Sequence, residues 1–338
     1  MNDWLPTLAD WLAAGQPAVL VTVVRADGST PREAGATMLV GRNSTADTIG
    51  GGPLEWLATA AARDLLAKGG QPHVMRCALG ASLGQCCGGV VWLALERIEA
   101  RDAASWQTRA AAVTAGQTLQ RRLLSGDEGS LWSMSTDEHG KRDPAQFWSD
   151  GGHWQFEQQI RKTQFPVVLF GAGHVGEAIA RALAPLGARI SWVDNRDSIF
   201  PAELPAGTDA IGTDTPTAEV RAAPPSAYFL VLTHDHGLDF ELCEAILARH
   251  DFAFFGLIGS ASKRARFEHR LIARGIDPAR LLDMTCPIGV PGIRGKEPAV
   301  IAASVAAQLL QVREARQAVA EASRPLRITP FLLSGARP

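Results

Sequence analysis

The sequence predicts an α/β protein in which an N-terminal α+β domain is followed by a doubly wound parallel sheet. From about Phe165 onward, short apolar runs alternate with amphipathic segments of helical length, which is the pattern of parallel strands joined by crossover helices. Before about residue 100, the apolar runs are β-branched and are separated mostly by glycine-rich turns. A length of 338 residues also suggests about two domains.

The overall composition is that of an ordinary globular protein and argues against several functional classes. Hydrophobic residues make up 46% and charged residues 20%, with 35 acidic against 33 basic side chains. We therefore expect no nucleic-acid partner, because nucleic-acid binding normally requires a basic excess or stripe. The longest aliphatic runs, such as Ala18 to Val24, are far shorter than the roughly 20 residues that span a bilayer, so we expect no membrane partner.

The first residues and the cysteines indicate a cytoplasmic protein. Residues 1–10 have no positively charged region and already include Asp3 and Asp10, so we expect no export signal. The five cysteines are odd in number and lack the spacing of a disulfide framework. A reducing compartment is the simplest interpretation.

We expect residues 1–100 to form the N-terminal α+β domain. Apolar residues at helical spacing predict a helix over 4–14, and Pro53 favours a second helix over about 53–68, because the N–H that proline lacks has no partner in the first turn. The expected strands are 18–24, 37–40, 73–78 and 90–98.

Residues 101–162 are expected to form a helical and irregular connector. The Ala- and Gln-rich stretch 102–125 predicts one helix. The polar stretch from Ser130 to Trp154 has isolated tryptophans and little periodicity, which indicates a small β excursion or a linker.

Residues 163–322 are expected to form the Rossmann-like domain, and 323–338 an extended tail. The expected strands are 167–170, 188–193, a short strand near Ala210, 228–232 and 254–258. The expected helices are 174–186, 237–249, 260–274 and 297–322.

A glycine fingerprint lies between the first strand and the first helix of this domain. The segment is Gly171-Ala172-Gly173-His174-Val175-Gly176, and Asp194 ends the next strand, 18 residues after Gly176. Such glycines permit a tight turn and close backbone approach, and the helix N-terminus offers N–H groups to a phosphate. An acidic residue in the position of Asp194 usually binds ribose hydroxyls. We therefore expect Gly171, Gly173, His174, Val175, Gly176 and Asp194 to bind a phosphate-containing cofactor.

A second polar turn, Thr233-His234-Asp235-His236, follows a later strand of the same sheet. Ligands of open α/β sheets bind at the carboxyl ends of the strands, so His234 is a candidate ligand contact. The i, i+2 spacing of the two histidines also permits a metal site, although no further His, Cys or Glu cluster is near in sequence. A solvated loop is the remaining interpretation.

Three glycine-rich loops interrupt the first domain, at Gly28 to Gly35, Gly50 to Gly52 and Gly80 to Gly89. Three such loops within a hundred residues predict backbone surfaces that approach a ligand closely, with Gly51 and Gly52 among them. Ordinary turns are the alternative interpretation. Arg32 supplies a forked donor suited to phosphate, or is an ordinary surface arginine.

The adjacent thiols in Gln85-Cys86-Cys87-Gly88-Gly89 are the sharpest chemical feature of the first domain. A thiolate in a glycine loop can bind a soft metal centre or carry sulfur. Alternatively, one thiol packs into the core and the other is inert.

Taken together, these segments resemble the XdhC/CoxI family, the molybdenum-cofactor chaperones of xanthine dehydrogenase. The matching segments of the first half are 28–36, 49–55 and 83–89. Those of the second half are 169–176, 193–196, 233–236, 256–260 with 263–264, 286–289 and 295–298. The resemblance is co-linear over both halves and is weakest over about 101–160.

The resemblance implies a non-catalytic carrier that binds molybdopterin-type cofactor as cargo and protects it. A cysteine desulfurase then sulfurates the cofactor, and the carrier inserts it into the apo large subunit of xanthine dehydrogenase. Gln85, Cys86 and Cys87 are implied near the cofactor, with either thiol as a molybdenum contact. Charge neutralisation would fall to basic residues of the matching segments, namely Arg32, Lys263, Arg264, Arg294 or Lys296.

Two other functional classes stay open from the sequence. An NAD(P)-dependent oxidoreductase would bind nicotinamide cofactor at the glycine loop. A pure scaffold that recruits a desulfurase would bind no small molecule. A homodimer is expected by analogy with sites that a second copy of the chain completes.

Overall fold

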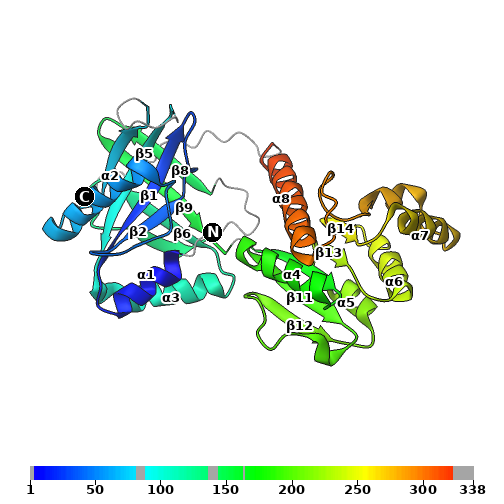
Figure 1. Ribbon diagram of the computed structural model, residues 1–338. Helices are drawn as coiled ribbons and strands as arrows, with labels where there is room; N and C mark the ends of the chain where they lie inside the picture. The colour runs from blue at the N-terminus through cyan, green and yellow to red at the C-terminus, as the bar shows by residue number, and fades with distance from the viewer. Residues whose placement is uncertain (1–3, 81–87, 136–143, 163, 323–338) are drawn as a thin grey trace. The chain divides into compact units, whose positions relative to one another are not determined.

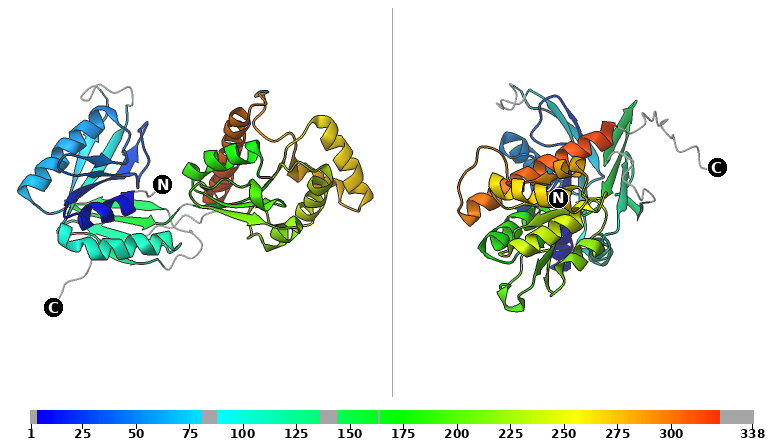
Figure 2. Two further views of the ribbon diagram at one scale, coloured as in Figure 1. Left: turned by 60° about the horizontal axis from the view of Figure 1, so that its bottom comes forward. Right: turned by 90° about the vertical axis from the view of Figure 1, so that its right-hand side faces the viewer.

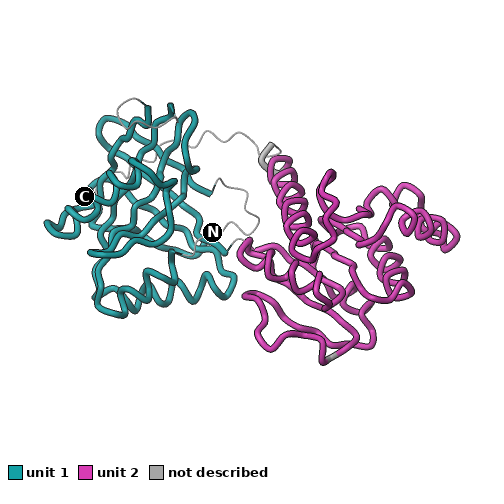
Figure 3. Tube along the Cα trace, in the orientation of Figure 1, with its two compact units in different colours: residues 1–163, 326–338 teal, residues 164–325 magenta. Residues whose placement is uncertain are grey.

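The computed structural model describes residues 4–80, 88–135, 144–162 and 164–322. The chain divides into two compact units, the first within Met1–Thr163 and the second within Gln164–Pro325 (Figure 3). Each unit has its own core and is described by itself. No helix among the described residues is long and apolar enough to cross a bilayer.

The first unit is built on a five-stranded antiparallel sheet of order β3-β2-β1-β5-β4. Its strands are β1 Ala18–Asp27, β2 Thr37–Val40, β3 Thr45–Ala46, β4 His73–Ala78 and β5 Val90–Ile98. Helix α2, Gly52–Lys68, packs on one face of this sheet, with Leu54 and Ala58 against the valines of β1 (Figure 1). Residues 18–24 of β1 are buried on both faces, so this stretch is almost entirely apolar and shows no polar alternation.

The opposite face of the first sheet is covered by a second, four-stranded antiparallel sheet of order β7-β6-β9-β8 and by two helices. These elements are α1 Trp4–Ala13, the 3₁₀ turn Ala100–Asp102, α3 Ala103–Thr114, β6 Leu119–Leu124, β7 Leu131–Met134, β8 Ala145–Asp150 and β9 His153–Ile160. A buried ion pair connects the two sheets, with Arg121 Nη2 at 2.6 Å from Glu96 Oε2. Arg121 also donates to Thr22 and Ser130.

The prediction of a single helix over 102–125 was wrong beyond Thr114. Gly116 takes a left-handed φ of 88°, which ends the helical run, and a strand starts at Leu119. On that strand Leu119, Arg121 and Leu123 point inward. Because arginine is rarely buried without a partner, Arg121 at the middle inward position was not counted as a core residue. The alternation of inward and outward residues that indicates a strand was therefore not recognised.

The stretch 101–162, expected as a connector, therefore contains four paired strands of the first unit. Between Ser130 and Trp154 the β excursion is the interpretation that the structure supports. The hairpin of β8 and β9 turns at Gly151 and Gly152, both with positive φ, and Asp150 pairs with His153 across the turn. A Gly-Gly pair between polar strands is a known hairpin signal.

The second unit is a six-stranded parallel sheet of order β12-β11-β10-β13-β14-β15. In chain order this is 3-2-1-4-5-6, the doubly wound dinucleotide-binding arrangement, so the predicted fold class is confirmed. The strands are β10 Phe165–Phe170, β11 Ala188–Asp194, β12 Thr208–Gly212, β13 Tyr228–Val231, β14 Phe254–Leu257 and β15 Met284–Thr285. The helices are α4 His174–Leu183, α5 Pro216–Ala222, α6 His236–Leu247, α7 Ala261–Ala273 and α8 Pro298–Ala322, with 3₁₀ turns at Ala184–Leu186, Asp197–Ile199 and Pro278–Asp283.

Helices cover both faces of this sheet (Figures 1 and 2). Alternate residues of β10 show the division: Val167 and Leu169 pack with α4 and α8, whereas Val168 and Phe170 pack with α5, α6 and α7. The long strands and helices follow the predictions to within a few residues. The short α5 and β15 were not predicted, because seven and two residues give no usable periodicity.

Candidate functional site

The glycine fingerprint forms the turn from β10 into α4, and each of its three glycines has a separate structural role. Gly171 has a φ of 112°, and a Cβ there would collide with the carbonyl of Leu232 at the end of the neighbouring strand. A Cβ on Gly176 would collide with the carbonyl oxygen of Gly171, so this glycine permits the close packing of helix on strand. Gly173 faces open space, with no atom within 4 Å of its ideal Cβ position.

The first turn of α4 is an anion-binding geometry. The N–H groups at the start of a helix have no intrahelical acceptor, and the helix dipole favours negative charge there. Gly173 and His174 are exposed, and Val175 is half-buried. The open Gly173 therefore lets a phosphate approach the backbone at the point where the N–H groups of His174 and Val175 are free to bind it.

Asp194 ends β11 beside this turn, and the protein itself engages both carboxylate oxygens. Oδ2 accepts the backbone N–H of Ala172 at 2.7 Å, and Arg196 donates to Oδ1 at 2.9 Å and to Oδ2 at 3.0 Å. Burial alone would raise the pKa of Asp194, but the hydrogen bonds and charge of Arg196, with the Ala172 N–H, outweigh burial and lower the pKa. Asp194 thus fixes the glycine turn instead of presenting free oxygens to a ribose.

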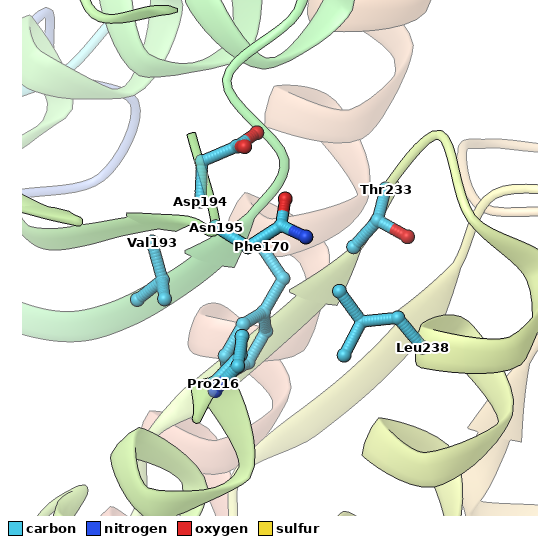
Figure 4. A pocket seen from close by; sticks show the side chains of 7 residues that line it. All are labelled: Phe170, Val193, Asp194, Asn195, Pro216, Thr233 and Leu238. Carbon is cyan, nitrogen blue, oxygen red and sulfur yellow. The ribbon is translucent and has the colours of Figure 1, made fainter. Parts of the chain in front are cut away.

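The crevice beside Asp194 is narrow. Figure 4 shows the side chains that line it, from the ends of β10, β11 and β13 and from the starts of α5 and α6. Its lining residues are Phe170, Val193, Asp194, Asn195, Pro216, Thr233 and Leu238. The cavity volume is about 10 Å³, which is the space of one water molecule. A nucleoside could enter this crevice only after the side chains move.

The Thr233–His236 turn is fixed by a buried residue that the sequence analysis missed, Asp239. The fully buried Asp239 carboxylate accepts the backbone N–H of Thr233 at 3.1 Å and its hydroxyl at 2.8 Å through Oδ1. Its other oxygen, Oδ2, accepts Lys263 Nζ at 2.5 Å. The only sequence signal was an aspartate on the apolar face of a helix, where an acidic residue requires a buried partner.

Lys263 is nearly buried and joins the ends of two strands. Besides pairing with Asp239, it donates at 2.9 Å to the backbone carbonyl of Ile258, the residue directly after β14. Its side chain also lines an open pocket between α6 and α7. The sequence-predicted Lys263 therefore lies at the carboxyl edge of the sheet, as the glycine turn does.

His234 and His236 are exposed on this turn. His236 Nδ1 lies 4.0 Å from Asp239 Oδ2, with its side chain 75% exposed. Within the described residues, no three His, Cys, Asp or Glu side chains gather as a metal site.

In the first unit, the described parts of the three glycine-rich loops come together at one end of the sheet. Gly50 has no room for a Cβ because Pro31 of the first loop packs against it. Gly89, at the end of the third loop, donates to the carbonyl of Ser29 at 3.1 Å and also has no room for a Cβ. The three loops therefore lie together, and their approach to a ligand stays a prediction. Gln85, Cys86 and Cys87 lie outside the described residues.

Glu55 fixes the second loop, and the sequence analysis did not single it out. Its Oε2 accepts the hydroxyl of Thr48 at 2.6 Å and the N–H groups of Ile49 and Gly51 at 3.2 and 3.0 Å. Glu55 therefore occupies the anion-binding position that these amides form at the start of α2. Gly51 donates its N–H within the protein, whereas Gly52 is exposed.

Arg32 bridges the first and second loops. It donates to the carbonyl of Thr48 at 3.2 Å and pairs with the adjacent Glu33 at 3.3 Å, with a third of its side chain exposed. An exposed ion pair of this kind contributes little to stability, which leaves the guanidinium able to exchange partners.

Two family comparisons match the two units in order. Residues 11–77 match the XdhC and CoxI family, and residues 167–309 match the XdhC Rossmann domain. The chain belongs to the XdhC/CoxI family.

Relatives of this XdhC/CoxI chain are found among bacterial proteins. It is 24% identical to a probable xanthine dehydrogenase subunit of Bacillus subtilis (strain 168), covering 91% of this chain and 97% of that protein. It is 32% identical over 150 residues to the uncharacterized protein YqeB of Escherichia coli (strain K12). That match spans 44% of this chain and only 27% of YqeB.

A crystal structure described as a xanthine dehydrogenase from Bacillus halodurans has the same fold. Its TM-score is 0.72 at 21% sequence identity, over 95% of this chain and 98% of that one. The two-unit architecture of this XdhC/CoxI chain is therefore that of a solved protein.

Proposed function

We propose that this chain is an accessory protein of xanthine dehydrogenase maturation that binds the molybdenum cofactor as cargo. It protects the cofactor, supports its sulfuration by a cysteine desulfurase and inserts it into the molybdenum-binding subunit of apo xanthine dehydrogenase. Membership of the XdhC/CoxI family supports this role, together with the near full-length similarity to a protein named as a xanthine dehydrogenase subunit.

The observation that carries cargo binding is the open first turn of α4 at Gly173. The cofactor is a pterin that carries a terminal phosphate, and the free N–H groups of this turn are suited to a phosphate. The glycine loops of the first unit, with Arg32, supply further backbone and cationic contacts. Cys86 or Cys87 is the proposed contact to molybdenum, because a thiolate is a soft ligand.

The proposal assigns no catalytic residue to this chain. The alternative, an NAD(P)-dependent oxidoreductase, requires a nucleoside beside Asp194. That crevice has about 10 Å³ of space, and Arg196 and Ala172 engage the Asp194 oxygens. The narrow crevice therefore supports a cargo that is held by its phosphate at the glycine turn over a dinucleotide whose nucleoside must fill the crevice.

Equilibrium binding of anaerobically prepared molybdenum cofactor to the full chain tests the proposal, with NAD and NADP as competitors. We expect tight cofactor binding that neither nucleotide displaces. Nucleotide binding without cofactor binding would contradict the proposal and support the oxidoreductase.

The double variant Cys86→Ala/Cys87→Ala tests the thiol role in the same assay. We expect loss of cofactor retention or of sulfuration by an added desulfurase and sulfur donor. The matched control is Cys77→Ala, since Cys77 is a buried core thiol of the same unit whose pKa is raised by burial. Wild-type behaviour of the double variant would remove the thiols from the proposal.

Sedimentation of the same preparations tests the expected homodimer.

A further inference from the structure

A ligand-sized pocket lies in the Rossmann unit at β13 and β14, the two strands that follow β10 in the sheet. It is an open cavity of about 340 Å³ at the carboxyl ends of β13 and β14, between the starts of α6 and α7. This volume lies in the range of small-molecule sites. The lining residues are Thr233, His236, Ile258, Gly259, Ser260, Lys263, Arg266 and Phe267.

The polar part of this lining is basic or neutral. Lys263, Arg266 and His236 contribute nitrogen donors, and Thr233 and Ser260 contribute hydroxyl groups. Among the described residues, no acidic side chain lines the cavity. The Asp239 carboxylate lies behind Lys263, is fully buried and has both oxygens occupied, so it offsets the lysine charge without facing the cavity.

Arg266 supplies the uncompensated charge. It is exposed, and within the described part of the chain it has no ion pair or hydrogen-bond partner. Its neighbour Arg264, by contrast, is paired with Glu268 at 2.7 Å. A forked guanidinium at the mouth of a pocket without acidic groups favours a phosphate or a carboxylate.

The rest of the lining is apolar and preorganised. The half-buried Ile258 supplies the apolar surface, whereas Phe267 is only 2% exposed and supports Lys263, whose Nζ lies 5.4 Å from the centre of the Phe267 ring. Lys263 is held by Asp239 and by the Ile258 carbonyl, so the ammonium needs little rearrangement to meet a ligand.

We infer that this pocket binds a small anion whose phosphate or carboxylate contacts Arg266 and Lys263 and whose apolar body packs on Ile258. This site is distinct from the glycine turn of α4, and the inference rests on the lining of the pocket, although Lys263 is also one of the basic residues that the family resemblance implies for the cofactor. Thr233 lines both this pocket and the narrow crevice beside Asp194, so the two regions adjoin at one residue.

Calorimetric titration of the full, cofactor-free chain with phenyl phosphate, benzoate and neutral benzyl alcohol tests the inference. We expect one molecule of at least one anion to bind, and benzyl alcohol to bind at least about tenfold more weakly, because it lacks the charge-assisted contacts. The comparison of phenyl phosphate with benzoate identifies which anionic group the pocket prefers.

The variant Arg266→Gln locates the binding. We expect it to weaken anion binding by about tenfold, since it removes a charge-assisted contact, with Arg266→Lys intermediate. The matched control is Arg42→Gln, which removes the same charge from an exposed arginine of the first unit and should leave anion binding unchanged. Because Arg266 is exposed and unpaired in the described chain, thermal unfolding of Arg266→Gln should match the wild type.

Three results would overturn the inference: no binding of either anion, equal binding of benzyl alcohol, or equal weakening by Arg42→Gln and Arg266→Gln. Weakening by Gly173→Ala but not by Arg266→Gln would also overturn it, because the anion would then occupy the glycine turn. Failure of molybdenum-cofactor binding with intact phenyl phosphate binding would contradict the proposed function alone.

Discussion

Asp194 and Ala172 are 22 positions apart, yet the buried carboxylate of Asp194 accepts the Ala172 backbone N–H at 2.7 Å. The same carboxylate forms a two-pronged ion pair with Arg196. The acidic residue of the nucleotide fingerprint thus supports the shape of the phosphate-binding turn, and its stabilising effect depends on its charge.

Asp194→Asn should lower the free energy of unfolding of the Rossmann unit by about 1.5–3 kcal/mol at pH 7, the range for hydrogen bonds to a charged group. Because the folded-state pKa of Asp194 lies below its ordinary value of 3.8, the stabilisation is complete above that value and is lost as pH falls through the folded-state pKa. Urea unfolding of both proteins between pH 7 and pH 3 checks this. A difference that does not narrow in acid would show that the carboxylate charge is not responsible.

The glycines at 173 and 176 offer a matched pair of alanine substitutions. Gly176→Ala should destabilise the protein by about 3 kcal/mol or more, because the new Cβ overlaps the Gly171 carbonyl within a close-packed turn. Gly173→Ala has room and a φ of −76°, so it should fold normally but weaken cofactor binding by obstructing the approach of the phosphate. Thermal unfolding and cofactor titration of both variants separate the two roles; unchanged binding in Gly173→Ala would place the phosphate elsewhere.

Asp239 and Lys263 form a buried pair that a double-mutant cycle should reveal. Asp239→Asn and Lys263→Met should each cost about 3–5 kcal/mol, because each leaves an uncompensated buried charge. The double variant should cost clearly less than the sum of the two, since no isolated charge remains. Chemical unfolding of the four proteins measures the coupling, and strict additivity would mean that the two side chains are independent.

Glu55 should control the order of the second glycine loop. Glu55→Gln removes the charge but keeps one amide oxygen that can accept from the loop, so we expect the free energy of unfolding to fall by about 1–2 kcal/mol. Amide hydrogen exchange should become faster at Ile49 and Gly51. The N–H of Gly89, which donates to the neighbouring first loop, is the internal control. Equal acceleration at all three amides would indicate general loosening of the unit.

The sequence by itself determined the features that depend on neighbouring residues. Strand and helix alternation in the second half, and the glycine turn of α4, follow from short-range spacing and from the backbone freedom of glycine. The three glycine-rich loops were visible for the same reason. Each of these signals lies within a few residues of chain, where local conformational preference decides the structure.

Only the tertiary structure decided which charges meet. Arg121 and Glu96 are 25 positions apart, and Asp239 and Lys263 are 24 apart, so no local pattern pairs them. The buried Arg121 also concealed a strand that was predicted as helix. Burial of a charge is costly without a partner, and packing alone brings that partner into reach. The contact of Asp194 with the Ala172 N–H, and the pocket between α6 and α7, likewise depend on elements that only the fold brings together.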